Sequence, residues 1–241
     1  MRSGNIEDIT KRLFESYQSD EYPFITPRDT PPSFYEFWDF IPTVSKLRRL
    51  FFPNYFGVGE ITKSKNMTKL ESKLKSLGDE FYRGIEPNML LIDSNIKNKE
   101  IGDIVHIALS KFPDIRETLK KDVVAAHNGD PAAGDYKDIT KVTNPEKIGY
   151  TEIIRAYPGL VALIVQRVAN VIYNLGVPIY PRELTEYTHK ILGIDIHPRV
   201  KIGEGFFMDH ATGIVIGATA EIEDNVRMYQ NTTLGAKNLS S

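Results

Sequence analysis

The chain has 241 residues, with 30 basic and 32 acidic side chains and a net charge of −2. It therefore lacks the excess of basic residues that would indicate binding to nucleic acid or to an anionic membrane. It contains no cysteine, which excludes disulfides, cysteine-ligated zinc and a thiol nucleophile. The N-terminus lacks the apolar core of a signal peptide and no apolar run is long enough to span a bilayer, so we expect a soluble cytoplasmic protein.

Residues 1–62 are expected to form an N-terminal extension rich in proline and aromatic residues. A short helix is predicted over 5–17. An extended or irregular stretch follows, indicated by Pro23, Pro27, Pro31, Pro32 and Pro42. The aromatic side chains among these prolines are too numerous for a solvated linker. We therefore expect the extension to pack on another part of the molecule or on another subunit.

Residues 63–192 are expected to form a helical domain. The first helix is predicted over 64–85, where leucines and Phe81 repeat on one face. Further helices are predicted over 99–111, from Pro113 to the breaker cluster at 128–131, from the Pro158–Gly159 break to Gly176, and from Pro181 to Gly193.

After Gly193 the pattern changes to aliphatic residues spaced by six. One series is Ile196, Ile202, Met208 and Ile214, and a second is Ile216, Ile222, Met228 and Leu234. The offset of two residues between the series places Ile214 and Ile216 together, both facing inward. A six-residue aliphatic repeat is typical of a β-helix in which three hexads make one coil. The predicted fold is therefore α+β, with a left-handed parallel β-helix over 193–241 that ends after about two coils.

Two segments resemble one family of hexapeptide-repeat enzymes. DIHPRVKIGEGFFMDHATGIVIG, at 195–217, and GDPAAGDY, at 129–136, are similar to motifs of the serine O-acetyltransferases. The resemblance implies transfer of an acetyl group from acetyl-CoA to the hydroxyl of L-serine, which gives O-acetylserine for cysteine biosynthesis. It also implies feedback inhibition by L-cysteine, and a homotrimer or a dimer of trimers.

The same resemblance assigns the site residues. His210 matches the catalytic base, and Asp195 matches the carboxylate that orients the imidazole. Asp130 and Asp209 match positions that hold the substrate amino acid, and His197 lies close to them in the motif. The acetyl-CoA stretch begins at Gly235 and Ala236, where the family usually has a second glycine. No metal is expected.

The family motif continues beyond this chain with further coils and an Arg-His-Pro segment, and no Arg-His pair occurs in these residues. We therefore expect a fragment of a longer enzyme. Three alternatives remain open: a hexapeptide acyltransferase for a sugar or xenobiotic alcohol, a zinc lyase using His197 and His210, and a non-enzymatic assembly module.

Overall fold

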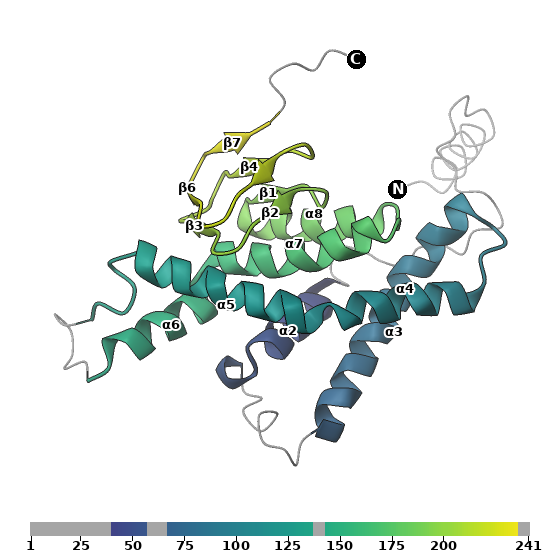
Figure 1. Ribbon diagram of the computed structural model, residues 1–241, viewed down its shortest axis with the longest axis horizontal. Coiled ribbons are helices and arrows are strands. Elements are labelled where there is room, and N and C mark those ends of the chain that lie inside the picture. The colour runs from purple at the N-terminus through teal and green to yellow at the C-terminus, as the bar shows by residue number, and fades with distance from the viewer. Residues whose placement is uncertain (1–39, 57–66, 137–142, 236–241) are drawn as a thin grey trace, which may run out of the picture.

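The computed structural model describes residues 40–56, 67–136 and 143–235 (Figure 1). The helix expected over 5–17 lies outside these residues, as do four of the five prolines and Ala236. The helices are α2 (Phe40–Phe51), the short 3₁₀ helix η2 (Pro53–Tyr55), α3 (Met67–Ile92), α4 (Asn98–Ser110), α5 (Phe112–Gly129), α6 (Pro145–Ala156), α7 (Pro158–Asn174) and α8 (Tyr180–Leu192).

The helices predicted between residues 64 and 193 are confirmed as α3, α4, α5, α7 and α8, with shifted ends. The interpretation of Pro42 as part of an irregular stretch is wrong, because Pro42 is the third residue of α2. Proline is tolerated in a first helical turn, where its missing N–H has no intrahelical partner. Helix α6 was not predicted, although Asn144 caps it by accepting a 3.0 Å hydrogen bond from the Lys147 N–H.

Helix α2 belongs to the hydrophobic core, which it joins through Phe40, Val44, Leu47 and Phe51. Its buried face lies against α3 and α7. Among the described helices none is by itself long and apolar enough to cross a membrane; α6 and α7 reach that threshold together, but they are bent by 62° where they meet.

Seven short strands form a three-sided coil that lies against α7 and α8 (Figure 1). They are β1 (Asp195–Ile196), β2 (Lys201–Ile202), β3 (Phe207–Asp209), β4 (Val215–Ile216), β5 (Glu221–Ile222), β6 (Arg227–Tyr229) and β7 (Thr233–Leu234). All pairs are parallel, in the sheets β1-β4-β7, β2-β5 and β3-β6. The chain therefore visits three faces in turn and then repeats them.

The two coils differ in length at the corner that carries His210. Asp195 pairs with Val215, twenty residues later, whereas Val215 pairs with Thr233, eighteen residues later. The first coil thus contains two extra residues, and they account for the phase shift in the aliphatic repeat. Ile214 and Ile216 are both buried, as predicted, and Val215 between them is exposed.

A buried ion pair joins the helical part to the coil. The Arg167 guanidinium on α7 binds both carboxylate oxygens of Asp122 on α5, each at 2.9 Å. The same guanidinium donates to the carbonyls of Ile202 and Gly203, and the Phe206 N–H donates to Asp122. Two helices and the first coil are therefore held by one polar network, and most of its hydrogen-bonding groups are satisfied inside the protein.

Candidate functional site

His210 lies on the long corner of the first coil, in a backbone conformation that side-chain-bearing residues rarely adopt. His210 and Ala211 both have positive φ, 57° and 67°. Ala211 is fully buried, whereas the His210 side chain is 72% exposed. Residues held in this region cost free energy and concentrate at functional sites, where the fold over-determines them. The corner therefore presents an imidazole to the outside of the coil on a fixed support.

Asp209 precedes this corner at the end of β3, and it is buried. Its carboxylate is bound by the guanidinium of Arg227, which comes from β6 on the next coil. Its Oδ1 lies 3.9 Å from Nε2 of His210. Because parallel pairing sets Phe207 opposite Arg227, the stacking of the two coils creates this ion pair.

Asp130 lies where α5 ends. One carboxylate oxygen accepts a 2.9 Å hydrogen bond from the Ala132 N–H, and the other accepts from the hydroxyl of Tyr157, at the α6–α7 junction. Among the described residues no cation forms a salt bridge with Asp130, so this carboxylate keeps its negative charge available to a ligand. A carboxylate of this kind suits an ammonium group.

Tyr157 connects Asp130 to the coil. Its ring stacks on Phe207 of β3, with 6.4 Å between ring centroids. Burial raises the pKa of the Tyr157 hydroxyl, and the hydrogen bond to Asp130 and the nearby Asp209 charge act in the same direction. The hydroxyl therefore stays protonated and keeps donating. The structure brings Asp130, Asp209 and His210 to one junction between helices and coil.

Asp195 and His197 belong to a second group, around Arg182 of α8. The Asp195 carboxylate lies 3.2 Å from the Arg182 guanidinium, and none of the interactions in the described residues joins it to His210. His197 accepts a hydrogen bond through Nδ1 from the Arg199 N–H and meets the Tyr173 ring edge-on. Burial lowers the pKa of His197, and the Arg182 charge adds to this shift.

Glu186, His189 and Asp195 place one ligand atom each within 4.8 Å of one another, a spacing that a metal ion could use. Arg182 already contacts both carboxylates, so its guanidinium offsets one of their two negative charges. The two histidines of the zinc-lyase alternative, His197 and His210, are not part of it.

Gly235 follows β7 and lies beside Gly217 of the previous coil, whose N–H donates to the Leu234 carbonyl at 2.7 Å. A methyl group on Gly217 would come within 3.5 Å of the Gly235 Cα, so the two coils approach closely here. Ala236, the other expected acetyl-CoA residue, lies outside the described residues.

Sequence reasoning missed Tyr157 and Arg227. Tyr157 stands next to the Pro158–Gly159 break, which predicted a helix start but said nothing about the tyrosine's contacts. Arg227 lies eighteen residues after Asp209, so a regular coil of three hexads already places the two residues opposite each other, and this spacing is the signal that could have found Arg227. In the structure the twenty-residue first coil sets Arg227 opposite Phe207, and the ion pair with Asp209 runs diagonally across the two strands.

No protein-family model matches this chain. Among curated proteins, it is 34% identical over 200 residues to the plasmid serine acetyltransferase of Synechococcus elongatus, and the match covers 79% of this chain. It is 37% identical over 121 residues to the serine acetyltransferase of Mycobacterium tuberculosis. The chain spans 58% of the length of the first relative and 47% of the second.

The structural comparison covers more of the molecule. The structure of Entamoeba histolytica serine acetyltransferase 1 in complex with L-cysteine superposes with a TM-score of 0.68 at 35% identity. The match covers 97% of this chain and 76% of the other. The similarity therefore includes the helices and the coil together, in the same arrangement. The chain belongs to the serine acetyltransferase family.

Proposed function

We propose that this chain is a serine O-acetyltransferase that moves an acetyl group from acetyl-CoA to the hydroxyl of L-serine, giving O-acetylserine for cysteine biosynthesis. Family membership supports the reaction class. The assignment of L-serine as the substrate rests on the Asp130 carboxylate. This carboxylate accepts hydrogen bonds from a hydroxyl and an amide, but pairs with no cation among the described residues. An amino acid supplies the missing ammonium group, whereas a sugar does not.

In this proposal the His210 imidazole accepts the proton of the serine hydroxyl as its oxygen attacks the thioester carbon. The carbon–sulfur bond then breaks, and the CoA sulfur takes the proton from the imidazolium. A neutral imidazole suits this step near neutral pH. Its exposure at a rigid corner leaves room for both substrates.

Asp130 and Asp209 hold L-serine, with Asp209 oriented by Arg227. Asp195 orients the imidazole once its carboxylate is released from Arg182, and His197 supports this region. Gly235 and Ala236 begin the acetyl-CoA stretch, and no metal takes part.

The proposal extends to the whole protein. Its parts are the extension 1–62, the helical domain 63–192 and a left-handed β-helix from 193, in a homotrimer or dimer of trimers in the cytoplasm. L-cysteine is proposed as the feedback inhibitor, because the similar Entamoeba protein was crystallised in complex with it.

The test is release of the CoA thiol by the full chain with acetyl-CoA and L-serine, compared with sugar and antibiotic acceptors. His210→Ala should lower kcat by about 10² to 10⁴. His106→Ala, on the exposed side of α4, serves as the control. Asp195→Asn should cost less than His210→Ala. A fully active His210→Ala variant, or turnover with sugars but not serine, contradicts the proposal; no turnover with any acceptor favours the assembly module.

A further inference from the structure

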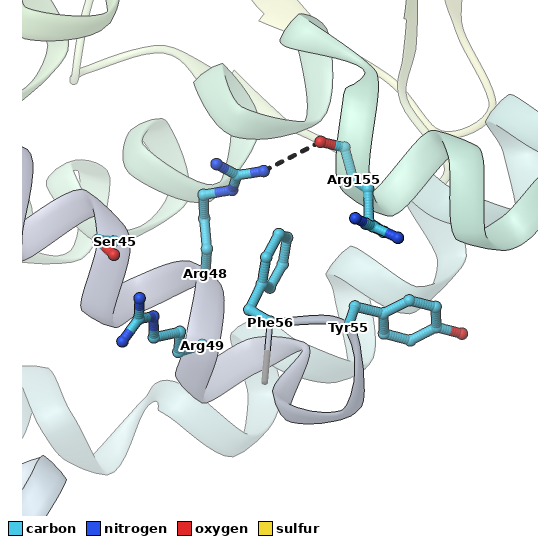
Figure 2. Close-up of a pocket in the computed structure, with 6 residues that line it drawn as sticks. All are labelled: Ser45, Arg48, Arg49, Tyr55, Phe56 and Arg155. Carbon is cyan, nitrogen blue, oxygen red and sulfur yellow. Dashed lines mark hydrogen bonds between the residues drawn. The ribbon is translucent and has the colours of Figure 1, made fainter. Parts of the chain in front are cut away.

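A cavity of about 470 Å³ lies outside all the residues assigned above. It is lined by Ser45, Arg48, Arg49, Tyr55, Phe56 and Arg155, which we call the arginine pocket (Figure 2). Its walls come from the second half of α2, the segment at and after η2, and the last turn of α6. Three helical segments, two of them within the first 62 residues, therefore converge on it.

The pocket carries three positive charges and no carboxylate lines it. Among the described residues, Arg48, Arg49 and Arg155 form no salt bridge. Three guanidinium groups around one cavity repel one another, and a bound anion would offset this repulsion. Arg116, Arg182 and Arg227, elsewhere on the described surface, each pair with a carboxylate.

Arg48 is held in place by the fold. It donates a 3.2 Å hydrogen bond to the Arg155 carbonyl at the end of α6, and its guanidinium lies 4.4 Å from the centre of the Phe56 ring. Its Nε is buried without an acceptor in the described structure, and burial lowers its pKa. Helix capping explains this one arginine.

Capping does not explain the other two arginines. The side chains of Arg49 and Arg155 are exposed and have no hydrogen-bond acceptor among the described residues. Figure 2 shows the Tyr55 hydroxyl pointing away from the three guanidinium groups, so the tyrosine contributes its ring and not its oxygen. The pocket thus combines guanidinium groups, which donate hydrogen bonds in pairs, with the aromatic rings of Tyr55 and Phe56.

We propose that the arginine pocket binds a phosphorylated small molecule. Its volume falls in the range of small-molecule sites, roughly 300–1,000 Å³. Guanidinium forks match the oxygens of a phosphate, which carries nearly two negative charges and so offsets more of the three positive charges than one carboxylate does. None of the residues assigned to acetyl transfer lines this pocket.

Binding to the full chain is measured by titration calorimetry with three probes: inorganic phosphate, pyrophosphate and citrate. The test variant is Arg49→Gln/Arg155→Gln, because both side chains are exposed and neither supports the fold; Arg48 is left intact since it caps α6. The matched control is Arg83→Gln, on α3, whose Nε contacts only a carbonyl of its own helix. Unfolding curves confirm that all variants are folded.

We expect pyrophosphate to bind the wild-type chain, with binding weakened roughly tenfold or more in the double variant and unchanged in Arg83→Gln. If pyrophosphate bound at the acetyl-CoA site instead, its affinity would be the same for the wild type, the double variant and Arg83→Gln. Equal affinities for the three proteins therefore overturn the proposal. Failure of the wild-type chain to bind either phosphate probe overturns it too. Citrate binding more tightly than pyrophosphate, in a manner sensitive to the double variant, overturns the phosphate class.

Discussion

The Asp130 carboxylate is oriented by one side chain, the Tyr157 hydroxyl, which stays protonated because burial and the hydrogen bond raise its pKa. Tyr157→Phe keeps the ring on Phe207 and removes only this hydrogen bond. We expect KM for L-serine to rise several-fold, up to about tenfold, with little change in kcat, because the bond orients a binding group.

The matched control for that variant is Tyr150→Phe, which removes a hydroxyl from a ring stacked on His127. Steady-state kinetics with varied L-serine distinguish the two variants. An unchanged KM in Tyr157→Phe would remove Tyr157 from the substrate site, whereas a fall in kcat alone would give it a role in the chemical step.

The stability of the protein should depend on pH through His197. Burial and the Arg182 charge lower its pKa, so in acid the unfolded chain takes up this proton more readily than the folded one. The contribution of neutral His197 to the free energy of unfolding is therefore complete above the pKa of about 6.5 that histidine has in the unfolded chain. It is lost as the pH falls toward the lower pKa of His197 in the folded protein. Other titrating groups act equally in a variant that lacks only this imidazole.

We expect the free energy of unfolding of His197→Gln to fall less than that of the wild type between pH 7 and pH 5. Urea unfolding at pH 8, 7, 6 and 5 measures the difference, and the pH 8 value gives the effect of the substitution that does not depend on protonation. Parallel pH profiles would show that the His197 environment is wrong.

At the scale of elements, the Asp122–Arg167 network sets how the first coil lies on α5 and α7. Arg167→Leu leaves a buried carboxylate without its cation, and we expect a loss of about 3–5 kcal/mol in the free energy of unfolding. Asp122→Asn/Arg167→Leu should lose less than the two single variants added together, because neither charge is then left alone.

Chemical denaturation of the four proteins of this cycle measures the coupling. The control is Lys120→Leu on α5, which removes an exposed contact with Glu117 and should change stability little. Additive losses at Asp122 and Arg167 would mean that the pair does not act as a unit.

Helices could be predicted from the sequence where one of their faces is strongly apolar, as in α3 and α7. The inward positions of the coil could be predicted from the six-residue aliphatic repeat. Prediction failed at α2, because a proline-rich context outweighed the apolar spacing of Phe40, Val44, Leu47 and Phe51. That face becomes favourable only when α3 and α7 cover it. Such burial depends on partners distant in sequence.

At the scale of the whole molecule, helices and coil share one hydrophobic core. Buried residues of the coil such as Ile196 and Met208 belong to the same cluster as Leu163 and Val168 of α7. A methyl group on Gly159 of α7 would lie 2.8 Å from the Met208 carbonyl oxygen, so the two parts are in direct backbone contact. The helical part and the coil should therefore unfold together.

We expect one transition when unfolding is followed by helical circular dichroism and by tyrosine fluorescence. Met228→Ala, buried in β6 of the coil, should lower stability by about 2 kcal/mol or more and shift both signals equally. The exposed Val215→Ala on β4 is the control. Two separated transitions, with only the later one shifted by Met228→Ala, would mean independent domains.

By itself the sequence determined the family, most of the helices and the inward positions of the coil, because these depend on local motifs and short periodicities. Only the tertiary structure decided that the first coil has twenty residues, that Tyr157 orients the Asp130 carboxylate, that Asp195 contacts Arg182, and that three arginines of α2 and α6 line one cavity. The physical reason is that these contacts join residues far apart in sequence, whose distances are fixed by packing and strand register and leave no periodic signal in the chain.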